Sequence, residues 1–308
     1  MIVHLEDTTS AAVASELVTL REQGGVMALG RVMTLVIVCS GSGIERAVQA
    51  ANAASREHPS RVLVIAPEAP EAAARLDAEI RVGGDAGASD VVILRPRGAA
   101  QQAMDTLVTP LVLPDTPIVA WWPHGGPDDL AADPLGRIAQ RRISDVGETA
   151  DPIGRLYGLR PSYSPGDTDL SWARTTLWRG LSAGVVEADP GMPITAVVVE
   201  GDSNRPSVHL LAAWFAQALD CTAQVVHEPG VNVITGVELE RQDGTAVRMH
   251  RPEGSAVVTI TTGGDMPRRV AMAKRPLEDS LMEDLRHLNP DEVYATVLLH
   301  GLDRVNVR

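Results

Sequence analysis

This sequence has few aromatic residues, one lysine and two cysteines. Its 308 residues include five Trp, three Tyr and one Phe, and the single lysine is Lys274. A Walker-type phosphate loop needs a lysine directly after its glycines, so that motif is excluded. Cys39 and Cys221 lie one in each half, with no CxxC spacing and no nearby histidine. Neither a disulfide framework nor a metal site is therefore indicated.

The chain also lacks long apolar runs and an excess of positive charge. No apolar run approaches the ~20 residues that a membrane-spanning helix needs. Acidic residues occupy the start of the chain, where a signal peptide would be basic, so we expect a cytoplasmic protein. A net charge of −13 and a pI near 5.0 disfavour contact with nucleic acid or an anionic membrane, and neither is expected as a partner.

What the chain does have is enough apolar material for two domains. Hydrophobic residues make up 44% of the 308, and this length favours two domains of about 150 residues each. Proline and glycine concentrate between residues 151 and 169, which is typical of a boundary. We place the boundary near residue 165, so the predicted domains are 1–165 and 166–308.

The first half predicts an α/β domain with a doubly wound, mostly parallel sheet. Its candidate strands are continuous β-branched runs, which indicate strands buried on both faces. A stripe of small residues from Ile44 to Ser55 predicts a helix between the first two strands. Gly24 and Gly25 are interpreted as the break before the first strand. The strands are expected at 34–39, 61–66, 90–94 and 117–121, with further helices near 71–79 and 99–107.

The second half predicts an α/β domain that continues into an antiparallel meander. A long helix at 170–186, a strand at 194–200, a helix at 206–219 and a strand at 222–227 should come first. Strand patterns separated by turn residues follow at 231–241, 246–251, 255–262 and 268–273. Helices at 277–288 and 290–299 should close the chain, with Asn289 as the cap of the last helix and Pro290 at its first position.

One short motif raises the question of a nucleotide. Ser40 to Gly43 (SGSG) lies between a predicted strand and a predicted helix, where dinucleotide folds bind phosphate. Arg46 stands where the third glycine would be, so we favour an ordinary turn and keep a nucleotide site as the alternative. His124 follows another buried strand, at the sheet edge where open α/β sheets bind ligands. A functional and a structural role for His124 both stay open.

Two segments hold four of the five Trp, namely 117–129 (PIVAWWPHGGPDD) and 164–179 (SPGDTDLSWARTTLWR). Large rings beside turns and helix starts, in a chain so poor in aromatics, predict a surface for a partner. In a helix beginning at 170, Trp172 projects opposite the apolar stripe, beside Arg179. It either packs beneath a neighbouring loop or meets another molecule, and both interpretations stay open.

The other residues of the second segment have simpler interpretations. Trp178 flanks the apolar stripe and is expected in the core. Asp169 precedes the predicted helix and is expected to be its N-cap. No HExxH, GxSxG or Cys-His pairing accompanies these segments, so the sequence predicts no catalytic residue, no cofactor and no metal site.

Four segments together carry a resemblance to a known family. They are 28–38 (ALGRVMTLVIV), 51–65 (ANAASREHPSRVLVI), 116–129 (TPIVAWWPHGGPDD) and 164–179. In this order, in a chain of this size, they resemble the glucose-6-phosphate dehydrogenase assembly protein (OpcA) family of actinobacteria and cyanobacteria. The resemblance covers nearly the whole chain and is clearest between residues 28 and 180.

The resemblance implies a function without a catalytic site. Members of this family are not dehydrogenases; they bind glucose-6-phosphate dehydrogenase, of the oxidative pentose phosphate pathway, and promote its assembly or activate it. Some relatives are linked to redox control, but a thiol switch is not expected here because Cys39 ends a predicted buried strand. The alternative is a protein that binds or converts a nucleotide or sugar phosphate at Gly41, Gly43 and His124. The partner-binding candidates are Trp121, Trp122, His124, Asp169, Trp172, Arg174 and Arg179.

Overall fold

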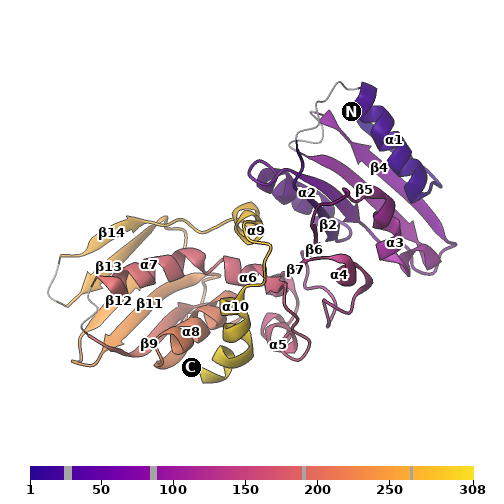
Figure 1. Ribbon diagram of the computed structural model, residues 1–308. Helices are drawn as coiled ribbons and strands as arrows, with labels where there is room; N and C mark the ends of the chain where they lie inside the picture. Colours follow the sequence, from indigo (N-terminus) through magenta and orange to yellow (C-terminus); the bar gives the residue numbers. More distant parts are fainter. Residues whose placement is uncertain (24–29, 84–88, 189–191, 264–265) are drawn as a thin grey trace. The chain divides into compact units, whose positions relative to one another are not determined.

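The computed structural model describes residues 1–23, 30–83, 89–188, 192–263 and 266–308. The expected break at Gly24 and Gly25 lies outside these residues. The chain forms two compact units that are each built from several stretches of sequence. Unit 1 comprises 1–145, 162–168 and 277–290, and unit 2 comprises 146–161, 169–276 and 291–308. The predicted α/β class is confirmed, with one mixed sheet in each unit (Figure 1).

The sheet of unit 1 has a parallel centre, as predicted. Its order is β1-β4-β5-β3-β2-β6-β7-β8, and β5, β3, β2, β6 and β7 run parallel. Renumbered along the chain, these five have the order 3-2-1-4-5 of a doubly wound fold. The strands are β1 (Ile2–Leu5), β2 (Met33–Val38), β3 (Ser60–Ile65), β4 (Arg75–Arg81), β5 (Asp90–Arg97), β6 (Ile118–Trp122), β7 (Arg141–Ser144) and β8 (Asp167–Asp169).

Continuous apolar sequence explains why the central strands lie inside. All six residues of β3 and the first five of β2 are buried, as expected for strands covered on both faces. Helix α9 packs along α2 within this unit. The unit contains the helices α1 (Ser10–Gln23), α2 (Gly43–Ala54), α3 (Met104–Val108), α4 (Pro134–Ile138) and α9 (Leu277–Leu285).

One helix prediction in this half is wrong, and another is correct only in part. The helix expected near 71–79 is largely β4, which pairs antiparallel with both β1 and β5. Its sequence RLDAEIR alternates with period two, placing Leu76, Ala78 and Ile80 in the core and charged side chains on the other face. In the range 99–107, where one helix is expected, a 3₁₀ turn at Gly98–Gln101 is followed by the short α3, which confirms the helix over the last residues of that range.

The sheet of unit 2 joins three parallel strands to the predicted meander. Its order is β14-β13-β12-β11-β9-β10-β15, with β9, β10 and β15 parallel and β11 to β14 antiparallel. The strands are β9 (Ile194–Gly201), β10 (Thr222–His227), β11 (Ile234–Arg241), β12 (Ala246–His250), β13 (Val257–Thr262), β14 (Arg268–Ala271) and β15 (Val305–Val307). Figure 1 shows α7 and α8 along this sheet.

The helices of unit 2 are α5 (Pro152–Gly158), α6 (Leu170–Ala173), α7 (Thr176–Glu187), α8 (Pro206–Ala218) and α10 (Glu292–Thr296), which a π-turn at Val297–Gly301 extends. The long helix expected at 170–186 is therefore two helices, α6 and α7. The expected cap at Asn289 is wrong, because Asp291 caps α10 by accepting a hydrogen bond from the backbone N–H of Tyr294 at 2.8 Å.

A buried histidine in α8 predicts how unit 2 responds to acid. The Nε2 of His209 lies 2.7 Å from the carbonyl oxygen of Ser203, and among the described residues its buried Nδ1 has no hydrogen-bond partner. Burial lowers the pKa of His209, opposed by the Ser203 carbonyl. Because the unfolded chain then binds the proton more readily, the free energy of unfolding should decrease as pH falls below about 6.5.

We expect urea midpoints for unit 2 to fall between pH 7.5 and pH 5.5, with part of that decrease removed by His209→Gln. The glutamine amide can still donate to Ser203 but does not titrate. If the urea midpoint of a folded His209→Gln protein depends on pH as steeply as that of the native protein, His209 does not contribute to the pH dependence.

Candidate functional site

The topology of unit 1 brings the glycine turn and His124 to the same place. The strand order reverses between β2 and β6, which makes this pair the switch point of the sheet. Ser40–Gly43 follow β2, and His124 follows β6. The Nε2 atom of His124 lies 2.7 Å from the position that a Cβ on Gly43 would occupy. A side chain at position 43 would therefore collide with this imidazole.

This arrangement differs from a dinucleotide site in one respect. In such sites the second glycine lets the pyrophosphate approach the backbone closely, whereas here the imidazole of His124 lies against that glycine. His124 is exposed. Ser42, at the N-cap of α2, makes no side-chain capping hydrogen bond. The turn thus has the position of a phosphate loop, but the imidazole of His124 fills the space beside Gly43 through which a phosphate would approach the backbone.

Trp121 and Trp122 do not present their rings to solvent. They end β6, inside the sheet, and are 0% and 5% exposed. The loop that follows folds back over Trp122: Gly126 has a φ of +88°, and a Cβ there would come within 3.0 Å of the Trp122 ring. The expectation that these two rings contact a partner directly is therefore wrong, because the loop and the sheet enclose them.

Asp169 has the capping role that the sequence predicts and no exposed surface. Its Oδ1 accepts a hydrogen bond from the Ser171 N–H at 2.8 Å, and its Oδ2 accepts one from the Val146 N–H at 2.9 Å. The side chain is 0% exposed. Direct contact of Asp169 with a partner is thus contradicted, and the carboxylate instead fixes the start of α6.

Trp172 is enclosed by its own unit. Its indole Nε1 donates to Oδ2 of Asp291 at 2.8 Å, and its ring lies 5.9 Å from that of Tyr294. The guanidinium of Arg179 lies 3.7 Å above the same ring, a cation–π geometry. Trp172 is 3% exposed. Of the two interpretations left open by the sequence, packing against the protein itself is the one observed. Trp178 is in the core, as predicted.

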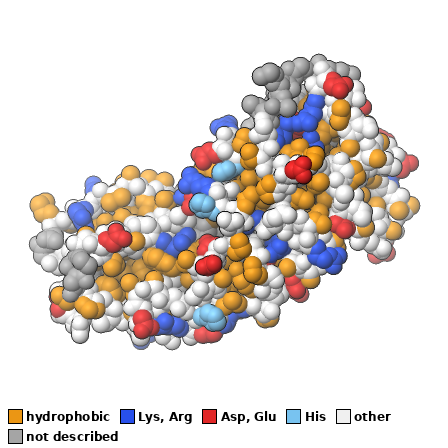
Figure 2. All heavy atoms as spheres, in the orientation of Figure 1, with side chains coloured by type: hydrophobic (Ala, Val, Ile, Leu, Met, Phe, Trp, Pro, Cys, Tyr) orange, Lys and Arg blue, Asp and Glu red, His pale blue; other side chains and the backbone are white. Residues whose placement is uncertain are grey.

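The remaining candidates in this segment reach the surface only in part. Arg174 and Arg179 are half-buried, and Leu177 between them is exposed. Arg179 also donates to the hydroxyl oxygens of Thr175 and Thr176, at 2.9 and 3.2 Å. On the face drawn in Figure 2, hydrophobic and charged side chains intermingle without a large area of one charge sign.

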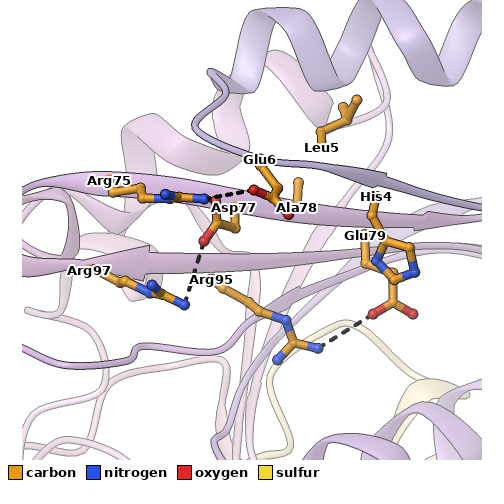
Figure 3. Close-up of a pocket in the computed structure, with 9 residues that line it drawn as sticks. All are labelled: His4, Leu5, Glu6, Arg75, Asp77, Ala78, Glu79, Arg95 and Arg97. Atoms are coloured by element: carbon orange, nitrogen blue, oxygen red, sulfur yellow. Dashed lines mark hydrogen bonds and ion pairs between the residues drawn. The ribbon is translucent and has the colours of Figure 1, made fainter.

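A charged pocket in unit 1 was not predicted. It has a volume of about 290 Å³ and lies on β1, β4 and β5 (Figure 3). Arg75 contacts Asp77 at 2.8 Å, Arg97 contacts Asp77 at 3.5 Å, and Arg95 contacts Glu79 at 3.4 Å. Each of these guanidinium groups faces a carboxylate, so the pocket offers a balanced surface rather than an anion site. The sequence signal that could have predicted this pocket is the charged side chain at every second position of β4.

Both cysteines are buried, which predicts slow thiol chemistry. Burial raises the pKa of Cys39 to about 11 and also raises that of Cys221. Native protein at pH 8 should therefore alkylate Cys39 with iodoacetamide about a hundredfold more slowly than protein unfolded in guanidinium. Mass spectrometry of timed samples measures this, and equal rates in the two states would contradict it.

The described residues contain neither a metal cluster nor a membrane-spanning helix. In the ranges given above, no group of three or more His, Cys, Asp or Glu side chains is arranged to hold a metal ion. None of the helices in those same ranges has the length and apolar character needed to cross a membrane.

Comparison with known families accounts for most of the sequence. Two domain families match, both described as parts of a glucose-6-phosphate dehydrogenase subunit. Residues 51–161 match the N-terminal domain of that description, and residues 165–298 match its C-terminal domain. The chain belongs to the OpcA family. The first matched region ends at residue 161 and the second begins at residue 165.

A curated relative agrees with this membership. A protein of Synechococcus elongatus, named provisionally as OxPP cycle protein OpcA, is 25% identical over 138 residues. The match covers 42% of this chain and 31% of the cyanobacterial protein. This OpcA-family chain therefore matches about a third of the length of that relative.

Solved structures with a similar arrangement are distant. A 3-ketoreductase from Actinomadura kijaniata, with NADP and TDP-benzene, has a TM-score of 0.45 at 12% identity and covers 89% of this chain and 98% of its own. An NAD binding oxidoreductase from Klebsiella pneumoniae has a TM-score of 0.45 at 9% identity, covering 89% and 95%.

Proposed function

We propose that this protein is a non-catalytic assembly factor that binds glucose-6-phosphate dehydrogenase in the cytoplasm and favours its active form. The observation that carries the proposal is the pair of family matches, which run in tandem over residues 51–161 and 165–298. The position of His124 against Gly43 supports the non-catalytic part, because it places a side chain where a cofactor phosphate would approach the backbone.

Activation by binding requires a difference in affinity between two states of the enzyme. A ligand shifts an equilibrium only as far as it binds one state more tightly, and a tenfold gain in the active population needs about 1.4 kcal/mol of such preference. A few arginine and hydrophobic contacts are enough for that amount.

The structure changes which residues of each unit we propose as partner contacts. His124, Arg174 and Arg179 reach solvent, at least in part. Trp172 lies directly beneath Arg179 and holds its guanidinium against the ring. We therefore propose contact with the partner for His124 in unit 1 and, separately, for Arg174 and Arg179 in unit 2. Trp121 and Trp122 in unit 1, and Asp169 and Trp172 in unit 2, are proposed to position the loop or helix of their own unit. Leu177, exposed on α7, adds an apolar contact beside Arg174.

The test is a titration of purified glucose-6-phosphate dehydrogenase with this protein, followed by enzyme rate and light scattering together. We expect saturable activation and a heavier complex. Arg174→Ala combined with Leu177→Ala should raise the half-saturating concentration of this protein about tenfold or more, since interface arginines often contribute above 1 kcal/mol to the binding free energy. Arg56→Ala, an exposed arginine of unit 1, is the control and should titrate like the native protein. No complex and no rate change would refute the proposal.

A second candidate is binding of a nucleotide or sugar phosphate at the β2–β6 switch point. The observation in its favour is that the fold brings Gly41, Gly43 and His124 to this point. A melting-temperature panel with NADP, NAD, ATP and glucose 6-phosphate tests it, because a ligand that binds the folded state must raise the midpoint. A shift that is lost in Gly43→Ala would support this candidate; the assembly proposal predicts no shift with any of the four.

A further inference from the structure

Charged side chains gather at one end of the strands of unit 1. Arg61 is the second residue of β3 and Asp90 the first of β5, and the register sets these two side by side. Arg21 lies in the last turn of α1, and Arg31 comes just before β2. We call these four residues the arginine cluster. Because β2, β3 and β5 run parallel, the cluster lies at their amino ends, and the glycine turn after β2 lies at the other end.

Positive charge exceeds negative charge in the arginine cluster. The Nε atom of Arg21 lies 3.0 Å from Oδ2 of Asp90, and Nη2 of Arg31 lies 2.6 Å from Oδ1 of the same carboxylate. Arg61 donates through Nη1 to the carbonyl oxygen of Leu111 at 2.6 Å, which is a neutral partner. Three guanidinium groups therefore share one carboxylate, which leaves an excess of two positive charges in a chain whose net charge is −13.

The excess charge is held away from water. Arg61 is 8% exposed, and its buried Nε has no hydrogen-bond partner among the described residues. The side chains of Arg31 and Asp90 are 10% and 5% exposed, and that of Arg21 is 25% exposed. Burial and the charges of Arg21 and Arg31 lower the pKa of Arg61 to about 10, against the effect of Asp90. Since a buried charge without a counter-ion destabilises a fold, the cluster needs further negative charge.

We propose that the arginine cluster binds one divalent inorganic oxyanion, phosphate or sulfate. The charge of such an ion equals the excess of two, and guanidinium groups hold its oxygens through paired N–H donors. The unpartnered Nε of Arg61 is one such donor, and Arg21, the most exposed of the three, gives access from solvent.

The burial of the cluster also restricts the ligand. Little of Arg31 or Arg61 reaches solvent, so an ester that carries a sugar or a nucleoside cannot bring its phosphate against both. A free ion at this place ties the end of α1 to the starts of β3 and β5, and it should therefore stabilise unit 1. The inference does not depend on the proposed partner enzyme.

The test begins with the full chain dialysed into a buffer without phosphate or sulfate. Sodium phosphate or sodium sulfate is added at an ionic strength that sodium chloride keeps constant, and calorimetric titration measures binding. We expect one site per chain for either ion, and a melting temperature raised by about 3 °C or more once the ion is in about a hundredfold excess over its dissociation constant. Glucose 6-phosphate should not bind at the cluster. No binding of either ion at about 20 mM would overturn the proposal, as would equal binding of glucose 6-phosphate.

Variants locate the site, because both ions also stabilise proteins by exclusion from their surfaces. Arg61→Met and, separately, Arg21→Gln should each raise the dissociation constant for phosphate at least about tenfold, the usual effect of losing a charged hydrogen bond. In buffer without phosphate, Arg61→Met should melt no lower than the native protein, since it removes a buried charge that lacks a counter-ion.

Two controls complete this experiment. Arg56→Met replaces an exposed arginine of unit 1 and should bind phosphate like the native protein. Gly43→Ala alters the glycine turn at the other end of the strands and should also leave phosphate binding unchanged. Circular dichroism checks that each variant is folded. Folded Arg61→Met and Arg21→Gln proteins that bind phosphate as tightly as the native protein would refute the site, and so would loss of binding in Gly43→Ala.

Discussion

Trp172→Ala should destabilise unit 2 by about 3–5 kcal/mol, the usual cost of removing a large buried aromatic side chain. The ring fills space between Arg179 and Tyr294 and also donates to Asp291. Asp291 is at the same time the N-cap of α10, so the truncation removes one hydrogen-bond partner of the residue that starts the helix. The urea midpoint of unit 2, read by far-ultraviolet circular dichroism, measures the effect.

Two milder substitutions separate the parts of this effect. Trp172→Phe keeps an aromatic face for Arg179 but cannot donate to Asp291, and we expect it to cost about 1–3 kcal/mol. Leu177→Ala removes an exposed side chain from α7 and should change the stability by less than about 0.5 kcal/mol. A Trp172→Ala protein as stable as the Leu177→Ala protein would contradict the enclosed position of the ring. The stability of Trp172→Ala also matters for the functional test. If this variant fails to activate the enzyme, the cause would be unfolding of unit 2 rather than the loss of a contact with the partner.

The central strands could be predicted from the sequence because their signal is local. Continuous apolar runs locate β2, β3 and β6 to within a few residues, and the turn residues between strands reveal the meander from β11 to β14. The short segment β4 was harder, since its glutamate and arginine residues favour helix while its period-two pattern favours strand. Pairing with β1 and β5 decides between them, and such pairing partners are not visible in a local window.

The candidate site was only partly predictable, for the same reason. A helical projection ranks the faces of one helix but cannot show that Asp291, 119 residues further along the chain, accepts a hydrogen bond from the indole of Trp172. The Trp pair ending β6 was located correctly, yet the return of the following loop over Trp122 depends on the left-handed conformation of Gly126. The neighbourhood of Gly43 and His124 follows from the strand order, which the motif alone does not give.

A buried ion pair that no local sequence pattern reveals holds a distant segment of the chain in unit 1. Arg141 of β7 donates through Nε to Asp284 of α9 at 2.9 Å, and its Nη1 donates to the carbonyl of Asn289 at 3.0 Å. The side chains of Arg141 and Asp284 are 4% and 2% exposed. They are 143 residues apart in sequence, and their contact fastens residues 277–290 to the sheet of unit 1. From the sequence alone, this segment is assigned to the second predicted domain, 166–308.

Asp284→Ala should therefore cost unit 1 about 3–5 kcal/mol, because it leaves the Arg141 guanidinium buried without its carboxylate. Hydrogen exchange should show α9 losing protection first, together with β7. The matched control is Arg286, which forms exposed ion pairs with Glu57 at 3.7 Å and with Glu283 at 3.0 Å. Arg286→Ala breaks both pairs beside the same helix and should cost less than about 1 kcal/mol.

Replacing both partners at once distinguishes charge burial from the loss of a necessary contact. Arg141→Met with Asp284→Leu removes both charges and keeps apolar volume, so it should recover most of the stability that Asp284→Ala loses. If α9 stays protected in the double variant, apolar packing of α9 along α2 is enough to hold the segment, and the ion pair determines its position. If α9 detaches in the double variant as it does in Asp284→Ala, the hydrogen bonds from Arg141 themselves hold residues 277–290 in unit 1.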